Sequence, residues 1–309
     1  MKAAVIDLGT NTFHLIIAEI SATGMEVIYK TNIPVRLGEG RINENLIIPS
    51  AFERGINTLK EFRTTIDAHN VSTIRAIATS AVRSAGNGAD FVAAAGARAG
   101  INIEVISGEQ EAGYIFNGVK ATGVIRDTSL IVDIGGGSTE FIICNSSEQL
   151  WKKSYNIGAA RLMQAYFHSD PISESDQTTI NQRLDSELAD LIAACAVYQP
   201  KVLVGSAGAF ETFAAMLLND VDVKTISFAE LNINAYKQLS DDLIRSTHAQ
   251  REVMPNLISL RVDMIVIAAL ITNYVLNTCG LQSMALSTYD LKMGVLHLIK
   301  EDQKFESAT

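Results

Sequence analysis

Residues 5–17 read VIDLGTNTFHLII: an apolar run ends in Asp7 and a small polar turn, and then becomes apolar again. A second stretch, IVDIGGGSTEFII at residues 131–143, repeats this order of an aspartate, any residue, a glycine, a short polar turn and an apolar run. Apolar runs on both sides of a glycine-containing turn predict two strands joined by a hairpin. Because the pattern occurs twice, we expect a chain built from two similar halves.

Length and composition agree with two globular domains. The chain has 309 residues, and domains usually contain about 150 residues. Hydrophobic residues make up 48% and charged residues 19%, which is the balance of an ordinary protein with ample core. The polar, glycine-containing stretch KATGVIRDT at residues 120–128 is the best candidate for a linker.

Each half is expected to form a mixed sheet with helices on its faces. In the first half, we expect strands near 2–7, 13–20, 24–32, 72–78 and 102–106, and helices near 50–68, 88–99 and 109–122. In the second half, we expect strands near 128–134, 139–145, 148–155, 201–205 and 283–288, and helices near 158–167, 173–198, 208–218, 228–246, 259–277 and 290–300.

Several classes of protein are disfavoured by the composition. The first residues show no export signal, and the longest apolar run, at 264–271, is far shorter than the roughly 20 residues that cross a bilayer. Three scattered cysteines fit reduced thiols, so we expect a soluble cytoplasmic protein without a membrane partner. A net charge of −9 argues against binding nucleic acid, although a small anion can still bind in a locally positive cleft.

The repeated turn has a chemistry of its own. A tight turn of Gly, Ser, Thr and Asn directs several backbone N–H groups into one concavity, which suits phosphate oxygens. The hydroxyls of Thr12 and Ser138 add donors, and the aspartate before each turn is placed to help hold a magnesium ion. The alternative is a pair of ordinary hairpin turns chosen for their backbone conformation. The duplication favours two turns that face each other and bind one phosphate chain.

A series of motifs resembles one known family. The motifs are, in order, DLGTNT at 7–12, VRLGEG at 35–40, ATSAVRSAGN at 78–87, VISGEQEAGYIFNGV at 105–119, DIGGGSTE at 133–140, GAARL at 158–162, GSAG at 205–208 and STYDLKMG at 287–294. Each is a weak signal alone, but their ordered set resembles the exopolyphosphatase and guanosine pentaphosphate phosphatase (Ppx/GppA) family over residues 4–295.

The resemblance implies a fold and a division into domains. The fold is α/β with two ribonuclease H-like lobes of the actin and sugar-kinase type, each a mixed sheet flanked by helices, and a cleft between them. The first lobe is expected at residues 1–122, completed by the C-terminal helix at 290–303. The second lobe is expected at residues 123–289.

The resemblance also implies a catalytic base, Glu111 in the motif SGEQEAGY. Ser107 and Gln110 form a capping-box pattern, so that Glu109 and Glu111 lie in the first turn of a helix. A carboxylate is favoured there by the helix dipole and is able to accept a proton from water. For Glu109 we expect only the role of favouring the helix start.

The remaining site residues bind phosphate or metal. A guanidinium at Arg83 suits phosphate oxygens, and Arg36 and Arg161 are weaker candidates for the same role. Glu140 is expected to help hold the metal through water; it aligns with His14 in the first copy, so this role is not shared by the repeat. The full expectation for phosphate binding is Gly9, Thr10, Asn11, Thr12, Arg83, Gly135, Gly136, Gly137 and Ser138, and for Mg²⁺ or Mn²⁺ it is Asp133, Glu140 and Asp7.

The activity implied by the resemblance is magnesium-dependent release of phosphate from the end of inorganic polyphosphate by direct attack of water. Three alternatives stay open: a guanosine pentaphosphate 5′-phosphohydrolase, an ATP-dependent kinase or ATPase of the same fold, and a sensor that binds phosphate chains without turnover. Family members are often dimers, so a homodimer is implied as well.

The sequence departs from the family pattern at three places. Thr10 stands where serine is usual, Ala209 stands where threonine is usual, and the closing motif reads LKMG at 291–294 where an arginine and a glutamate are common. We expect Ala209 and the LKMG motif to lie away from the proposed chemistry.

Overall fold

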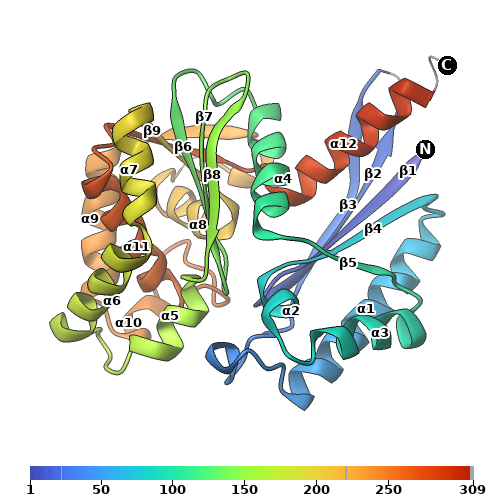
Figure 1. Ribbon diagram of the computed structural model, residues 1–309, viewed down its shortest axis with the longest axis horizontal. Helices are drawn as coiled ribbons and strands as arrows, with labels where there is room; N and C mark the ends of the chain where they lie inside the picture. The colour runs from blue at the N-terminus through green and yellow to red at the C-terminus, as the bar shows by residue number, and fades with distance from the viewer. Residues whose placement is uncertain (22, 220, 307–309) are drawn as a thin grey trace. The chain divides into compact units, whose positions relative to one another are not determined.

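The computed structural model describes residues 1–21, 23–219 and 221–306. The chain divides into two compact units, which we treat separately (Figure 1). The first unit joins Met1–Gly118 to Leu291–Thr309, and the second unit is the continuous segment Val119–Asp290. Within the described residues, none of the helices is both long and apolar enough to cross a membrane.

The first unit is a five-stranded mixed sheet with helices on both faces. Its elements are β1 (Lys2–Leu8), β2 (Thr12–Ile20), β3 (Met25–Pro34), the 3-10 helix η1 (Ile42–Glu44), α1 (Pro49–Ala68), β4 (Thr73–Ala78), α2 (Ser80–Ser84), α3 (Gly88–Ala99), β5 (Ile103–Val105), α4 (Gly108–Ala121), whose last residues pass into the second unit, and α12 (Leu291–Glu306). The strand order is β3-β2-β1-β4-β5, in which the first three strands are antiparallel neighbours and β1, β4 and β5 are parallel.

Side chains along β1 point alternately to the two faces of this sheet, of which one is covered by α1 and α3 and the other by α12. Ile6 and Leu8 are fully buried in a cluster with residues of α1 and α3, such as Phe62 and Phe91. Asp7 lies between Ile6 and Leu8 in the strand, so its side chain points to the opposite face. That face carries α12, which packs along β1 and β2 (Figure 1).

The second unit repeats this topology in a six-stranded sheet. Its elements are β6 (Ser129–Ile134), β7 (Thr139–Cys144), β8 (Gln149–Tyr155), α5 (Ala159–Tyr166), α6 (Glu174–Glu187), α7 (Ala189–Tyr198), β9 (Val202–Ser206), α8 (Ala207–Leu217), the 3-10 helix η2 (Val223–Thr225), β10 (Phe228–Leu231), α9 (Ile233–Arg245), α10 (His248–Glu252), α11 (Ile265–Thr278) and β11 (Ser283–Ser287). The strand order β10-β11-β9-β6-β7-β8 matches that of the first sheet once the additional edge strand β10 is set aside. The expected pair of mixed sheets is confirmed.

Three expected helices have different bounds. The expected helix at 228–246 is the strand β10 followed by α9, because Phe228–Leu231 pairs with the edge of β11 and the Asn232 side chain then caps α9. The expected helix at 173–198 is divided at Leu188, where the backbone leaves the helical region and the side chain is fully buried. The expected helix at 259–277 begins only at Ile265, and the short helices α2 and α10 were not expected.

Candidate active site

The first hairpin connects β1 and β2 through a tight turn at residues 9–12. The N–H of Gly9 donates to the carbonyl of Thr12 across 3.2 Å. A Cβ atom on Gly9 would lie 2.9 Å from that carbonyl oxygen, so the turn can close only with glycine at this position. Thr10 and Thr12 are both buried, at 4% and 6% exposed.

The second hairpin, between β6 and β7, closes in the same way. The N–H of Gly135 donates to the carbonyl of Ser138 across 3.0 Å, and a Cβ atom on Gly135 would lie 3.0 Å from the same oxygen. The repeated sequence pattern is therefore a repeated backbone structure, down to one hydrogen bond in each turn.

Each turn is held by a second segment that the sequence marks as a motif. In the first unit, the N–H of Arg36 donates to Asn11 and that of Gly38 to Thr10, at 2.7 and 3.0 Å. Arg36 itself has a positive φ of 51°, an uncommon conformation for a side-chain-bearing residue. The motif VRLGEG therefore supports the first turn through its backbone.

The motif GAARL supports the second turn. The N–H groups of Ala159 and Ala160 donate to the carbonyls of Gly135 and Gly136, at 2.8 and 2.9 Å. Arg161 adds a bond from Nε to the carbonyl of Gly137 at 3.2 Å, and burial lowers the pKa of its guanidinium. Arg161 thus binds the turn.

Arg83 and Glu111 form an ion pair in the first unit. Nη1 of Arg83 lies 2.9 Å from Oε2 of Glu111 and 3.0 Å from the carbonyl oxygen of Ile106. Both side chains are largely enclosed, with 23% of Arg83 and 10% of Glu111 exposed. The sequence places both residues in the site, and the structure brings them into direct contact.

The strands bring this pair toward the first turn. Leu8 and Ala78 are neighbours in the parallel pair β1 and β4, and the N–H of Thr79 donates to Leu8 at 3.4 Å. The N–H of Ile106 donates to Ala78 at 3.1 Å, so β5 ends at the same edge. The first turn, the start of α2 and the start of α4 therefore all lie at the carboxyl ends of parallel strands, where α/β sheets bind ligands.

The helix start that carries Glu111 has the expected capping box. The N–H of Gln110 donates to Oγ of Ser107 at 3.2 Å, and the N–H of Ser107 donates to Oε1 of Gln110 at 2.9 Å. Glu111 as a whole residue is 7% exposed, whereas Glu109 is exposed to solvent. Of the two carboxylates, only Glu111 is enclosed in the site.

Asp133 and Glu140 supply the best candidate for a metal site. They are direct neighbours across β6 and β7, so their side chains lie on the same face of the sheet. Asp133 is 8% exposed and Glu140 is 1% exposed, and Oγ of Ser154 donates to Glu140 at 2.6 Å. Two neighbouring carboxylates on one face are suitable ligands for a divalent cation.

The donor set is small, which suits magnesium. No group of three or more His, Cys, Asp or Glu side chains gathers into a metal site within the described parts of the chain. Mg²⁺ is commonly bound by one or two carboxylates, with water and substrate phosphates completing the six positions. The pair Asp133 and Glu140 fits that requirement.

The first hairpin differs, because a lysine lies beside its aspartate. Nζ of Lys292, on α12, lies 3.8 Å from Oδ2 of Asp7, and the two side chains are 15% and 16% exposed. The LKMG motif was expected to lie away from the proposed chemistry, but its lysine contacts Asp7, one of the expected metal ligands. Its helix belongs to the first unit and packs on the sheet face to which Asp7 points.

The structure adds one residue that the sequence reasoning missed, Arg261. Its guanidinium lies against Gly208: a Cβ atom on that glycine would be 1.7 Å from Nη2 of Arg261. Burial lowers the pKa of Arg261, and the charges of Glu211 and Asp133 act in the opposite direction. The neighbouring Ala207 has a positive φ of 64°, a second sign of a tightly constrained backbone. Arg261 thus brings a buried positive charge to the second hairpin.

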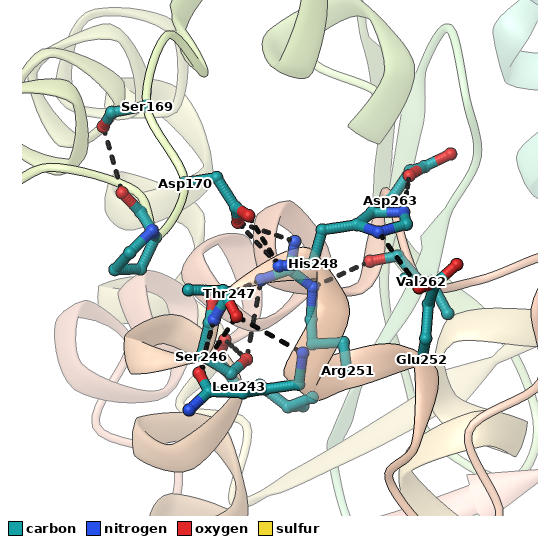
Figure 2. Close-up of polar contacts among 12 residues, drawn as sticks. Ser169, Asp170, Leu243, Ser246, Thr247, His248, Arg251, Glu252, Val262 and Asp263 are labelled. Carbon is teal, nitrogen blue, oxygen red and sulfur yellow. Dashed lines mark hydrogen bonds and ion pairs between the residues drawn. The ribbon is translucent and has the colours of Figure 1, made fainter.

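A buried arginine anchors the loop that leads to Arg261 (Figure 2). Arg251 is 2% exposed and donates to the carbonyls of Val262 at 3.0 Å and Ser246 at 2.5 Å. Asp170 accepts from Nη2 of Arg251 at 3.4 Å and from the N–H of His248 at 2.8 Å. These bonds fix the backbone next to Arg261.

The predicted site residues are divided between the units. Asp7, the turn at 9–12, Arg83 and Glu111 lie in the first unit. Asp133, the turn at 135–138 and Glu140 lie in the second. The binding of one anion by both turns remains a prediction from the sequence.

Comparison with known proteins identifies the family. The sequence model of the Ppx/GppA phosphatase family matches residues 16–301. The chain belongs to the Ppx/GppA phosphatase family. The family and the enzyme class implied by the motifs, a phosphatase-type hydrolase, are thereby confirmed.

Solved structures of this family share the whole fold. A crystal structure of an exopolyphosphatase from Cytophaga hutchinsonii is 36% identical, covers 98% of both chains and superimposes with a TM-score of 0.95. A Ppx/GppA family member from Aquifex aeolicus is 25% identical over 97% of this chain and 98% of its own, with a TM-score of 0.80. The expected fold of two actin-like lobes is confirmed.

Relatives known by sequence carry two different names. A putative exopolyphosphatase of Haemophilus influenzae is 28% identical over 97% of this chain and 92% of its own length. A guanosine-5′-triphosphate,3′-diphosphate pyrophosphatase of Pseudoalteromonas translucida is 32% identical over 70% of this chain, but the match spans only 43% of that relative.

Proposed function

We propose that this protein is a metal-dependent exopolyphosphatase, which releases inorganic phosphate from the end of inorganic polyphosphate by direct attack of water. The observation that carries the proposal is the enclosed Glu111 carboxylate, held by Arg83 at the edge of the sheet where the first phosphate-binding turn lies. This contact places a carboxylate and a guanidinium within one hydrogen bond of each other, as a base and a phosphate-binding cation would need to be.

The proposed reaction needs little covalent chemistry from the protein. A water oxygen forms a new bond to the terminal phosphorus while the bridging P–O bond breaks, and Glu111 accepts the proton of the attacking water. The bridging oxygen stays on the shortened chain, and the other product is inorganic phosphate. Phosphoryl transfer of this kind depends on positioning and charge neutralisation.

Charge neutralisation comes from several groups. Arg83 binds oxygens of the reacting phosphoryl group, and the backbone N–H groups of the turns at 9–12 and 135–138 bind the neighbouring phosphates. Asp133 and Glu140 would hold Mg²⁺ or Mn²⁺, which neutralises negative charge on the phosphate oxygens when it is bound. Arg261 adds positive charge beside Asp133.

Glu111 is tested by the substitution Glu111→Gln, which keeps the size of the side chain but removes the base. With magnesium and polyphosphate, we expect phosphate release to fall by about a hundredfold or more, because general bases contribute at least that much. The substitution Glu109→Gln, at an exposed carboxylate two residues earlier in the same helix, should leave the rate close to that of the parent. Equal rates for the Glu111→Gln variant and the parent would refute the base assignment.

A second candidate substrate is guanosine pentaphosphate, with the same bond cleavage and a different leaving group. The relative from Pseudoalteromonas translucida, named for such a nucleotide, supports it at 32% identity. The exopolyphosphatase of Cytophaga hutchinsonii, 36% identical over nearly the whole of both chains, supports polyphosphate. Phosphate release from polyphosphates of several lengths and from the nucleotide, assayed side by side, decides between them by kcat/KM.

A further inference from the structure

The two hairpins share a backbone but differ in charge at equivalent positions. In the first, Asp7 pairs directly with His14 across β1 and β2. In the second, Asp133 pairs with Glu140 across β6 and β7. Within its hairpin, each aspartate therefore has one cross-strand neighbour on its own face of the sheet, and this neighbour is a base in one unit and an acid in the other.

The strands on either side of each hairpin also differ in the residues that they place beside the aspartate. Beyond Glu140 the row across the second sheet continues to Ser154, and beyond Asp133 to Ser206, so that polar oxygen atoms flank both carboxylates. On one side of Asp7 the corresponding neighbour is Ile77. On the other side, beyond His14, the first row continues to Asn32. The first row therefore holds one carboxylate between an imidazole and an isoleucine, whereas the second holds two adjacent carboxylates with hydroxyl groups beside them. Magnesium and manganese prefer oxygen ligands, so the second row is the better site for them.

Lys292 adds a cation at the first aspartate. Its ammonium lies 3.8 Å from the Asp7 carboxylate, and both side chains are mostly shielded from water. α12 is held firmly in place: a Cβ atom on Gly294 would lie 1.8 Å from the carbonyl oxygen of Tyr114 in α4, and Val295 and Leu296 are fully buried. The packing of α12 therefore fixes the backbone that carries Lys292.

We propose that Lys292 is a built-in counterion of Asp7 that keeps divalent cations away from the first hairpin, so that Asp133 and Glu140 alone form the metal site. Asp7, expected from the sequence to share in metal binding, instead neutralises Lys292 and orients it beside the turn at 9–12. The inference rests on the proposed metal-dependent function and assigns the ion to one of its two hairpins.

The test measures metal binding without turnover. The complete chain is titrated with Mn²⁺ in the absence of substrate, and free Mn²⁺ is followed by its electron paramagnetic resonance signal. We expect one ion per parent chain, loss of that ion in Asp133→Asn and Glu140→Gln, and affinity within about twofold of the parent in Asp7→Asn. The variant Lys292→Met should bind a second ion, whereas Lys292→Arg, which keeps the charge, should not.

A second substitution identifies where the additional ion binds. In the double variant Asp7→Asn with Lys292→Met, the second ion should be lost again. Circular dichroism and the thermal unfolding midpoint of each variant show whether it is folded, and Lys292→Gln replaces Lys292→Met if the latter does not fold.

Three results would overturn the inference: a loss of Mn²⁺ affinity in Asp7→Asn as large as in Asp133→Asn, no second ion in either neutral variant at Lys292, or no Mn²⁺ bound by the parent. A parent chain that binds Mn²⁺ at Asp133 but releases no phosphate from any substrate would refute the proposed function and leave this inference intact.

Discussion

Gly208 shows how closely single residues are fitted in the second unit. The guanidinium of Arg261 occupies the space that a side chain at this position would need, and Arg261 in turn supplies positive charge beside Asp133. No motif in the sequence pointed to Arg261, because its nearness to the second hairpin depends on a loop of irregular backbone. The signal in the sequence was Gly208 of the GSAG motif. Only the folded chain shows that this position must be glycine because Arg261 occupies the space beside it.

The substitution Gly208→Ala is expected to destabilise the protein. The added methyl group must displace Arg261, and overpacking of this kind costs about 1–3 kcal/mol. The matched control is Gly96→Ala in α3, where the nearest atom, Oδ1 of Asn102, would lie 3.8 Å from the new methyl group. That variant should gain about 0.4–1 kcal/mol, because alanine reduces the freedom of the unfolded chain.

Urea unfolding gives both free energies, and phosphate release shows the functional effect. We expect turnover to fall in Gly208→Ala and to stay unchanged in Gly96→Ala. A Gly208→Ala variant with the stability and activity of the parent would contradict the close contact between Gly208 and Arg261.

At the scale of elements, the start of α4 positions the proposed base. Ser107→Ala removes one half of the capping box and is expected to cost about 1 kcal/mol of unfolding free energy. It should also lower kcat, because Glu111 lies in the same first turn. Ser173 is a matched control: its side chain caps α6, accepting from the N–H of Asp176 at 3.0 Å, and it lies outside the proposed site.

The variant Ser173→Ala should therefore lose stability but keep kcat. Stability is measured by urea unfolding and kcat by phosphate release at saturating substrate. An equal loss of stability with unchanged kcat in both variants would show that the cap of α4 does not orient Glu111.

Most elements could be predicted from sequence periodicity, and the failures have physical causes. The apolar residues at 228–231 were expected to continue into a helix, but they form a strand that pairs with β11 at the edge of the sheet. Asn232, an evident N-cap, was the signal that the helix starts later. The late start of α11 was hidden, because the buried Arg251 stabilises the preceding loop by bonds to distant carbonyls.

At the scale of the whole molecule, the duplication could be predicted from two glycine turns, and the family resemblance assigned the last helix to the first lobe. The contact of that helix with the first hairpin was not predicted. Lys292 and Asp7 lie at opposite ends of the sequence, and their ion pair depends on the packing of α12 against β1. Such a long-range contact has no local sequence pattern.

We expect fragments that correspond to the two units to differ in whether they unfold cooperatively. The second unit is one continuous segment with its own large core, so a chain of residues 123–290 should unfold cooperatively in urea. Residues 1–118 alone should not, because they lack α12 and expose one face of β1 and β2. Joining residues 291–306 to the end of this fragment by a flexible linker should restore a cooperative transition.

Circular dichroism during urea titration follows each fragment. A cooperative transition for residues 1–118 without α12, similar in midpoint to that of the linked fragment, would show that the helix is dispensable for the first unit.

Because α12 follows the second unit in the chain but belongs to the first unit, it determines which unit can fold first during synthesis. Domains generally fold as they emerge from the ribosome, starting with the N-terminal one. Here residues 1–118 wait for α12, since Lys292, Val295 and Leu296 follow the whole of the second unit in the chain. The second unit can thus fold earlier than the first, and the Asp7 side of the nascent sheet stays without its helix until residues 291–306 have been made.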